Sequence, residues 1–316
     1  LTEIYNLVSN LEVGHDDFTV QELITDYTTP NLNLEEDTLV VLNPEGQIVA
    51  SQDVFATDPI PVHPTVWGRV HPDYTGLGLG TYLIRWGIER ARHVLDKVPE
   101  EYRVAVHSFS LDQAEESIKL IEAHGYTPRR HFFRMKIEMN SAPPAPEWPE
   151  GIRLETCTIP DGIPNYFRAL DDAFKDHFGY IEEPFDHALA EFKHRRLKDD
   201  GFDPSLWFQA MDGDEIVGIC LGRKTGWESE KVGHVNVLGV RRPWRKRGLG
   251  LALLNHIFNV YWERGQHIVK LGVDADSLTG AVGLYERAGM KVIHQFNVYQ
   301  LELRPGIELG KTSAED

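Results

Sequence analysis

The stretch Val240-Arg-Arg-Pro-Trp-Arg-Lys-Arg-Gly-Leu-Gly250 decides the fold of the second half of this 316-residue chain. It follows a strand-like run, His234–Val240, and precedes an amphipathic helix predicted over Leu251–Arg264. Backbone N–H groups at the start of a helix are unpaired, and the helix dipole adds positive potential there. Gly248 and Gly250 let an anion approach the backbone because they carry no Cβ. We therefore interpret this stretch as a loop that cradles a phosphate or pyrophosphate.

Other glycine-rich loops bind different ligands, and two of these are disfavoured by the spacing. A dinucleotide loop needs Gly-x-Gly-x-x-Gly, but Leu253 occupies the third glycine position. A nucleoside-triphosphate loop needs Gly-Lys-Ser or Gly-Lys-Thr, which is absent. The remaining alternative is a tight turn beside a solvated basic cluster, and the loop alone leaves it open. That cluster consists of Arg241, Arg242, Arg245, Lys246 and Arg247.

The first half of the chain contains a second copy of the loop. Val70-His-Pro-Asp-Tyr-Thr-Gly-Leu-Gly-Leu-Gly80 aligns with it without gaps. In both halves a helix, a strand, a helix that ends on glycine and a final strand follow in the same order. The final strands are predicted at Phe132–Glu138 and Gln295–Leu303. This shared order indicates that one α/β unit has been duplicated.

Proline residues between the halves mark the predicted domain boundary. The segment 140–151 is read as a proline-rich linker, because its prolines deny continuation of a helix or a sheet. We expect a noncatalytic N-terminal domain over 1–139, a catalytic C-terminal domain over 152–305 and an acidic tail over 306–316. The length suits two domains.

Composition restricts the partners. The net charge of −17 argues against nonspecific binding to nucleic acid or to an anionic membrane, and it is compatible with a cationic small-molecule acceptor. Cys157 and Cys220 lie in apolar strand-like runs and are predicted to be buried free thiols. No apolar run is long enough to span a bilayer, and the histidines show no metal-ligand spacing. We expect a cytoplasmic monomer or homodimer without a metal.

Two motifs together carry a family resemblance. Arg-x-x-Gly-x-Gly after a strand, with Leu284-Tyr-Glu-Arg-Ala-Gly289 on a later helix, resembles the GNAT superfamily of N-acetyltransferases. The resemblance covers nearly all of 152–303 and, more weakly, about 20–138. It implies an α/β fold with a mixed sheet, here as two tandem GNAT-like domains. It also implies transfer of an acetyl group from acetyl-CoA to a primary amine of a small molecule. The tandem arrangement is most similar to mycothiol synthase and its relatives.

The resemblance implies where coenzyme A would bind. In this family the loop amides hold the pyrophosphate, and the fourth strand splays from its neighbour and pairs with the pantetheine arm. Ser277 stands near a position where relatives often have asparagine. The implied cofactor-binding residues are Leu238, Val240, Arg245, Lys246, Arg247, Gly248, Leu249, Gly250 and Ser277.

Catalysis needs a deprotonated amine, a stabilised carbonyl oxygen and a protonated thiolate leaving group. Tyr285 stands where the family commonly places its general acid, although a tyrosine there can also be a packing residue. His234 stands where relatives similar to mycothiol synthase have a glutamate, and imidazole titrates near neutrality, which suits a base. The alternative is an ordinary hydrogen-bonded histidine. Asn236 lies on the same strand face and is a candidate to orient the acceptor.

The first half lacks several of these groups. Ile121 stands in place of Tyr285, and Thr75 and Leu77 replace two of the loop arginines. Its glycines are retained, so a second, noncatalytic cofactor site is expected at Val70, Thr75, Gly76, Gly78 and Gly80.

The sequence gives less information about the residues of the second half that would bind the acceptor. In this fold the connection between the first two helices overhangs the acceptor pocket, so Asp176 and His177 are candidate acceptor-binding residues. The alternative is an ordinary polar helix end. For the whole chain, a noncatalytic acyl-CoA sensor or scaffold remains the rival function, whereas a nicotinamide oxidoreductase is disfavoured by Leu253.

Overall fold

The computed structural model describes residues 1–226, 228–277 and 280–312, and the chain divides into two compact units. Unit 1 comprises Leu1–Phe132 and His294–Leu309, and unit 2 comprises Phe133–Ile293 together with the residues from Gly310. The division between these units lies inside two long strands, β5 (Thr127–Glu138) and β11 (Lys291–Arg304), each of which begins in one unit and ends in the other. The domain boundary at 140–151 stays a prediction from the sequence.

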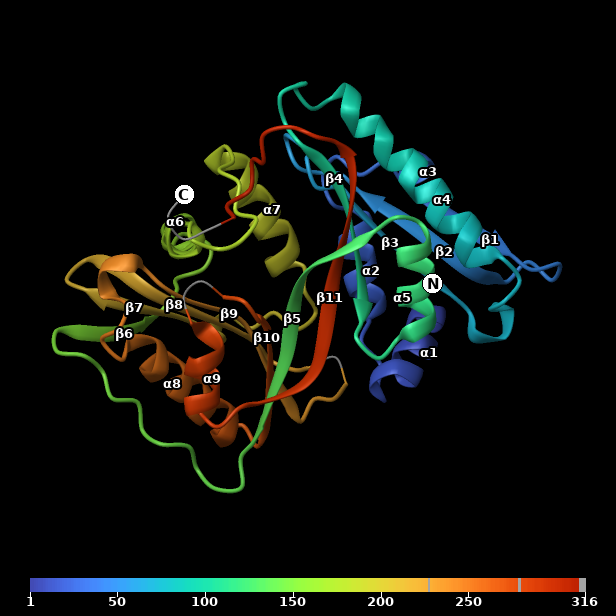
Figure 1. The fold of residues 1–316 in the computed structure, drawn as a ribbon. Helices are drawn as coiled ribbons and strands as arrows, with labels where there is room; N and C mark the ends of the chain where they lie inside the picture. The colour runs from blue at the N-terminus through green and yellow to red at the C-terminus, as the bar shows by residue number, and fades with distance from the viewer. Residues whose placement is uncertain (227, 278–279, 313–316) are drawn as a thin grey trace. The chain divides into compact units, whose positions relative to one another are not determined.

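Unit 1 is built on a sheet with the strand order β1-β2-β3-β4-β11 (Figure 1). Neighbouring strands are antiparallel except β3 and β4, which are parallel, so the sheet is mixed. The elements of unit 1 before β5 are α1 (Thr2–Val13), α2 (Val20–Tyr27), α3 (Leu34–Asp37), β1 (Thr38–Leu42), β2 (Ile48–Phe55), β3 (Thr65–Val70), α4 (Leu79–Ala91), β4 (Val104–Leu111) and α5 (Glu115–Ala123).

Unit 2 has the strand order β5-β10-β9-β8-β7-β6, again mixed, because β10 and β9 are parallel whereas β9, β8, β7 and β6 are antiparallel. Its elements after β5 are β6 (Ile152–Thr156), α6 (Ile163–Phe174), α7 (Phe185–Leu197), β7 (Trp207–Asp212), β8 (Glu215–Arg223), β9 (Val232–Val240), α8 (Leu249–Glu263), β10 (Ile268–Asp274) and α9 (Ala281–Arg287). The predicted α/β fold with a mixed sheet is confirmed.

The two halves of the sequence exchange their final strands. The predicted strand Gln295–Leu303 pairs with β4 of unit 1, from Phe296 opposite Leu111 onward, rather than closing the second half. The end of β5 instead packs in unit 2, where Met135 lies in the core. Strand pairing is set by long-range contacts, and two strands of similar pattern offer the same local signal. The sequence therefore predicted both strands and assigned each to its own half.

Helices cover both faces of the sheet of unit 2 (Figure 1). Strand β8 shows why, because its apolar side chains alternate between two cores. Ile219 and Leu221 pack with α6 and α7, whereas Cys220 packs with α8 on the other face. A strand that is covered on both faces has apolar residues in a continuous run and not in alternation. Cys157 and Cys220 are buried free thiols, as predicted.

Strand β9 separates from β10 part of the way along its length. The two strands pair from Val232 opposite Ile268 to Val235 opposite Leu271, and among the described residues β10 offers no partner to 236–240. In unit 1, β3 pairs with β4 only at Thr65 opposite His107. Each unit therefore has a parallel strand pair that opens toward its glycine-rich loop, with main-chain groups of β9 left available on that side.

No helix in the described part of the chain combines the length and the apolar character needed to cross a membrane.

We expect His107, a partly buried histidine of β4, to make unit 1 sensitive to acid. Burial, with a smaller contribution from His63, lowers the pKa of His107 to about 4. Below the usual pKa of about 6.5 the unfolded chain binds a proton that folded His107 does not, so stability falls as the pH is lowered toward 4. We expect the free energy of unfolding to fall by about 1.4 kcal/mol per pH unit from this group in that window. Urea titrations at several pH values test it, and His107→Asn should flatten the slope whereas exposed His93→Asn should not.

Candidate functional site

The loop between β9 and α8 presents its backbone to solvent. Lys246 and Gly248 have positive φ angles of 61° and 88°, and a short 3-10 turn, Arg242–Trp244, precedes them. Among the residues that the structure describes, no backbone N–H from Lys246 to Leu251 has a backbone acceptor. Alternating conformations of this kind turn successive amides toward one point and form an anion-binding concavity. The predicted phosphate cradle thus has the required backbone geometry.

The loop of unit 1 has the same backbone conformation. Gly78 has φ 83° and ψ −1°, close to 88° and −9° at Gly248. Thr75 has φ −71° and ψ 158°, close to −67° and 160° at Arg245. The next residue is Gly76 with φ 75°, where unit 2 has Lys246. The alignment of the two loops therefore extends from residue type to main-chain torsions.

The two glycines of the second loop have different roles. A Cβ at Gly248 would meet nothing within 4 Å, so glycine is favoured there by the left-handed backbone alone. A Cβ at Gly250 would lie 3.2 Å from Leu284 Cδ2, so glycine there also lets α8 approach α9 closely. Leu249, between them, is buried in the core, and only its backbone is positioned to contact a ligand.

A cavity of about 730 Å³ in unit 2 brings most of the predicted residues together. The loop, the open end of β9 and the start of α9 form its walls, and the end of α6 contributes as well. Its size is typical of a cofactor site. The predicted residues that line it are Asp176, His177, Leu238, Val240, Arg245, Lys246, Gly248, Gly250 and Tyr285.

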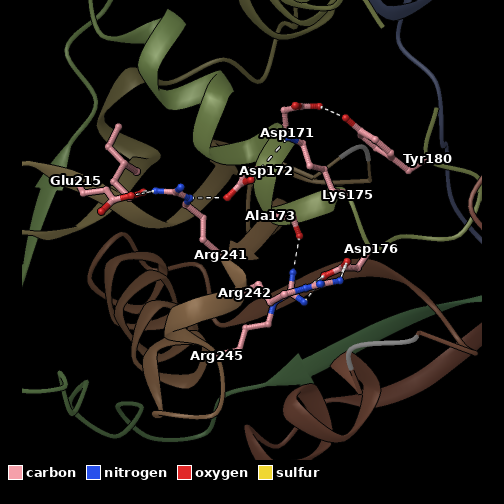
Figure 2. A network of polar contacts seen from close by, with 11 residues as sticks. Asp171, Asp172, Ala173, Lys175, Asp176, Tyr180, Glu215, Arg241, Arg242 and Arg245 are labelled. Carbon is pink, nitrogen blue, oxygen red and sulfur yellow. Dashed lines mark hydrogen bonds and ion pairs between the residues drawn. The ribbon is translucent and has the colours of Figure 1, made fainter. Parts of the chain in front are cut away.

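Asp176 binds two loop arginines (Figure 2). Its carboxylate accepts hydrogen bonds from Arg242 Nε at 3.1 Å and from Arg245 Nη1 at 2.6 Å, and Arg242 Nη2 makes a further contact. Arg245 also donates to Val240 O and to Ala173 O, each at 2.9 Å. The hydrogen bond from Arg242 is the main cause that lowers the pKa of Asp176, although burial opposes it. The carboxylate is therefore charged and ties α6 to the loop.

Three of the five cations in the basic cluster are therefore paired with carboxylates and are not free to bind a ligand. Arg241 binds Asp172 and Glu215 and lies over the Trp244 ring, so it too is paired. Within the described residues, Lys246 and Arg247 alone among the five cations of the cluster have side chains without a hydrogen-bond or ion-pair partner, and both are exposed. The sequence predicted the charge of the cluster but gave no signal that acidic residues of α6 and the connection after it would neutralise most of it.

Tyr285 lies in the cavity with its side chain 7% exposed. Burial, with a smaller contribution from Cys220, raises its pKa, so the phenol stays protonated at neutral pH. Its hydroxyl has no hydrogen-bond partner in the described part of the protein. A protonated, unengaged hydroxyl can donate to a ligand. The corresponding residue of unit 1, Ile121, is buried in an apolar core.

His234 lies deeper in β9 and does not line the cavity. It is 9% exposed, and burial, followed by the charge of Arg223 and three other nearby cations, lowers its pKa well below the usual value. The ring is therefore neutral and can accept a proton, but it is a weaker base than an exposed histidine. Asn236 is half-buried two residues along the strand, at the point where β9 leaves β10.

Of two further predicted ligand-contact residues, His177 lines the cavity and Ser277 does not. His177 lies at the cavity wall with its ring 4.2 Å from that of Phe174, in a tilted arrangement. Ser277 lies beyond β10, and its N–H donates to Asp274 O at 3.1 Å; it is not part of the cavity lining. Three further residues of α9 line the cavity: Ala281, Leu284 and Arg287. Sequence reasoning missed Ala281 and named Leu284 and Arg287 only as parts of the family motif.

Comparisons with known proteins agree with this geometry. The Acetyltransferase (GNAT) family matches residues 167–290. A mycothiol acetyltransferase of Thermobispora bispora is 33% identical over 225 residues, which is 70% of each chain.

Solved structures extend the similarity to both units. A GCN5-related N-acetyltransferase from Sphaerobacter thermophilus is 36% identical, with a TM-score of 0.79 over 98% of this chain and 94% of that one. A tandem GNAT protein from the clavulanic acid biosynthesis pathway shares the fold at 14% identity, with a TM-score of 0.67 over 97% of this chain and 94% of that one. Family match, sequence identity and fold agree: this chain belongs to the GNAT family of acetyltransferases.

Proposed function

We propose that the chain transfers an acetyl group from acetyl-CoA to a primary amine of a small molecule, by direct attack within a ternary complex. One observation carries the proposal: the unpaired amides of 246–251 and the protonated hydroxyl of Tyr285 border the same cavity. The amides suit the diphosphate, and the open edge of β9 suits the pantetheine arm. No metal ion or covalent intermediate is needed for this reaction.

The proposed steps assign one role to each group. The amine loses a proton, with His234 as the base acting through water, because the ring is buried away from the cavity. The nitrogen then attacks the thioester carbon, and a β9 amide near Val240 polarises the carbonyl oxygen. The nitrogen of the adduct releases its second proton to water as the C–S bond breaks, and Tyr285 donates its proton to the departing thiolate. Tyr285 then regains a proton from water, so the products are the amide and free coenzyme A. We assign to Asn236, on β9, the role of holding the water or the amine, although it is not among the residues that line the cavity.

The acceptor is proposed from the relatives. Proteins named mycothiol acetyltransferase match about 70% of this chain, so a mycothiol-related amine is the first acceptor to assay. Asp176 lines the cavity, but Arg242 and Arg245 already neutralise its carboxylate. We therefore assign Asp176 to positioning the loop arginines and not to recognising the amine.

A second candidate function concerns unit 1 alone. Its loop has the torsions of the catalytic loop, but Ile121 cannot donate a proton. This favours acyl-CoA binding without catalysis, so unit 1 would act as a ligand-holding copy within one duplicated chain.

Calorimetry with acetyl-CoA tests both proposals on the full chain. Gly248→Ala forces a side chain into the left-handed region, which costs about 1–2 kcal/mol, so we expect acetyl-CoA affinity at the catalytic unit to fall about fivefold to thirtyfold. Gly78→Ala is the matched control in unit 1, because its torsions and surroundings are the same. It should leave acetyl transfer unchanged. Absence of any acetyl-CoA uptake by the unaltered chain would refute the cradle.

A further inference from the structure

Three metal-ligating side chains lie together at the start of α7. Glu183, His187 and Glu191 are spaced by four residues; Glu183 precedes the helix, and His187 and Glu191 lie on successive turns of it. One ligand atom from each lies within 4.8 Å of the other two. All three residues are partly buried, unlike most exposed acidic clusters.

Two atoms of this cluster are buried without a partner. Nε2 of His187 and Oε1 of Glu191 have no hydrogen bond within the described residues and are almost inaccessible to solvent. A buried acceptor without a partner is costly and uncommon, so both atoms are candidates to hold a ligand. Nδ1 of His187 lies 3.1 Å from Oε2 of Glu183, which orients the ring. With the Nδ1 proton donated to that carboxylate, Nε2 keeps a free lone pair.

We propose that this cluster, Glu183, His187 and Glu191, binds one divalent transition-metal ion of the zinc class. Nε2 of His187 and Oε1 of Glu191 are the direct ligands, and water fills the remaining positions. Glu183 fixes the imidazole tautomer, as carboxylates commonly do behind a metal-bound histidine. Imidazole with carboxylate suits zinc and its neighbours better than magnesium or calcium, which prefer oxygen ligands alone.

The surroundings supply space and negative charge. A cavity of about 440 Å³ borders the cluster and is lined by both glutamates. Asp171 and Glu182 line the same cavity, where Arg195 is the one basic residue, so carboxylates outnumber cations four to one. The cavity therefore opens beside Glu191, although the Oε1 atom itself is covered from solvent and His187 does not line the cavity.

The ion would have a structural consequence. Glu183 precedes the first turn of α7, whereas Glu191 lies two turns into it. The segment before Glu183 is the connection from α6, whose residues Asp176 and His177 line the larger cavity. By holding Glu183 close to His187 and Glu191 of α7, the ion would fix the end of that connection. The sequence predicted no catalytic metal, and this ion would be structural.

Titration of the chelator-treated full chain with Zn²⁺, in competition with a coloured chelator, tests the proposal. We expect one high-affinity ion per chain, at least tenfold weaker binding in Glu191→Gln, and loss of that ion in His187→Asn. Glu183→Gln should weaken binding about tenfold to a hundredfold because it acts through the ring. Exposed Asp186→Asn, on the same helix outside the cluster, is the matched control and should change nothing.

Co²⁺ provides a readout independent of affinity, because ligation produces visible absorption bands that shift when a ligand is lost. Zn²⁺ should also raise the melting temperature of the unaltered chain and not that of His187→Asn. Glu191→Gln keeps the side-chain shape, so it reports on ligation even if His187→Asn fails to fold. The proposal is overturned if Zn²⁺ stoichiometry and Co²⁺ spectra are the same in Glu191→Gln, Asp186→Asn and the unaltered chain.

Discussion

Replacing Tyr285 by phenylalanine should lower kcat about 10²-fold to 10³-fold while leaving the dissociation constant of acetyl-CoA nearly unchanged. General acids contribute factors of this size, because an unprotonated thiolate is a poor leaving group. The hydroxyl has no protein partner in the described residues, so its removal leaves no buried group unsatisfied. Steady-state rates combined with calorimetry measure the two quantities separately.

Tyr166→Phe is the matched control for that experiment. Tyr166 is likewise a buried tyrosine of unit 2. Its hydroxyl has no hydrogen-bond partner among the described residues, and it lies outside the cavity. Its loss should be neutral or slightly stabilising and should not change kcat. An unchanged kcat in Tyr285→Phe would remove the acid assignment and leave Tyr285 as a packing residue.

Replacing Asp176 by asparagine should raise the KM for acetyl-CoA about tenfold and lower the free energy of unfolding by about 2–3 kcal/mol. Its carboxylate holds Arg242 and Arg245. The Arg242 side chain is exposed, but that of Arg245 is mostly buried, so loss of the carboxylate leaves the charge of Arg245 uncompensated in a partly desolvated place. Arg245 also donates to Val240 O, so the loop that bears the unpaired amides would lose its anchor. Thermal or urea unfolding measures the stability, and initial rates measure the KM.

Asp172→Asn supplies the control for Asp176→Asn. Asp172 also pairs with a loop arginine, Arg241 at 2.6 Å, but it is 37% exposed and does not line the cavity. Exposed pairs contribute about 0–1 kcal/mol, so a small effect is expected. A rise in the acceptor KM, with the acetyl-CoA KM unchanged in Asp176→Asn, would instead support the sequence-based hypothesis that Asp176 binds the acceptor.

The paired arginines also bear on how the phosphate is held. Arg245 has its Nε, Nη1 and Nη2 atoms engaged by Val240, Asp176 and Ala173. In the proposed cofactor site, anion binding would then depend on the amides of 246–251 and on the exposed cations Lys246 and Arg247. Amides fixed by the backbone need no reorganisation on binding, whereas a free long side chain loses rotamer entropy.

Local pattern determined much of this protein before any contact was known. The order of strands and helices, the buried thiols of Cys157 and Cys220, and the loop from Val240 to Gly250 follow from periodicity and from where glycine is required. The backbone match between Gly78 and Gly248 follows from the same repeat. These features depend on short stretches of chain, which is why the sequence alone predicts them.

Only the tertiary structure decided which distant groups meet. It assigned β11 to β4, it placed Asp176 against Arg242 and Arg245, and it buried His234 among cations rather than in the cavity. None of these contacts has a local signal. Strand exchange depends on pairing across nearly 200 residues, and the pKa of a histidine depends on charges carried by other strands and helices, so the packed chain sets both.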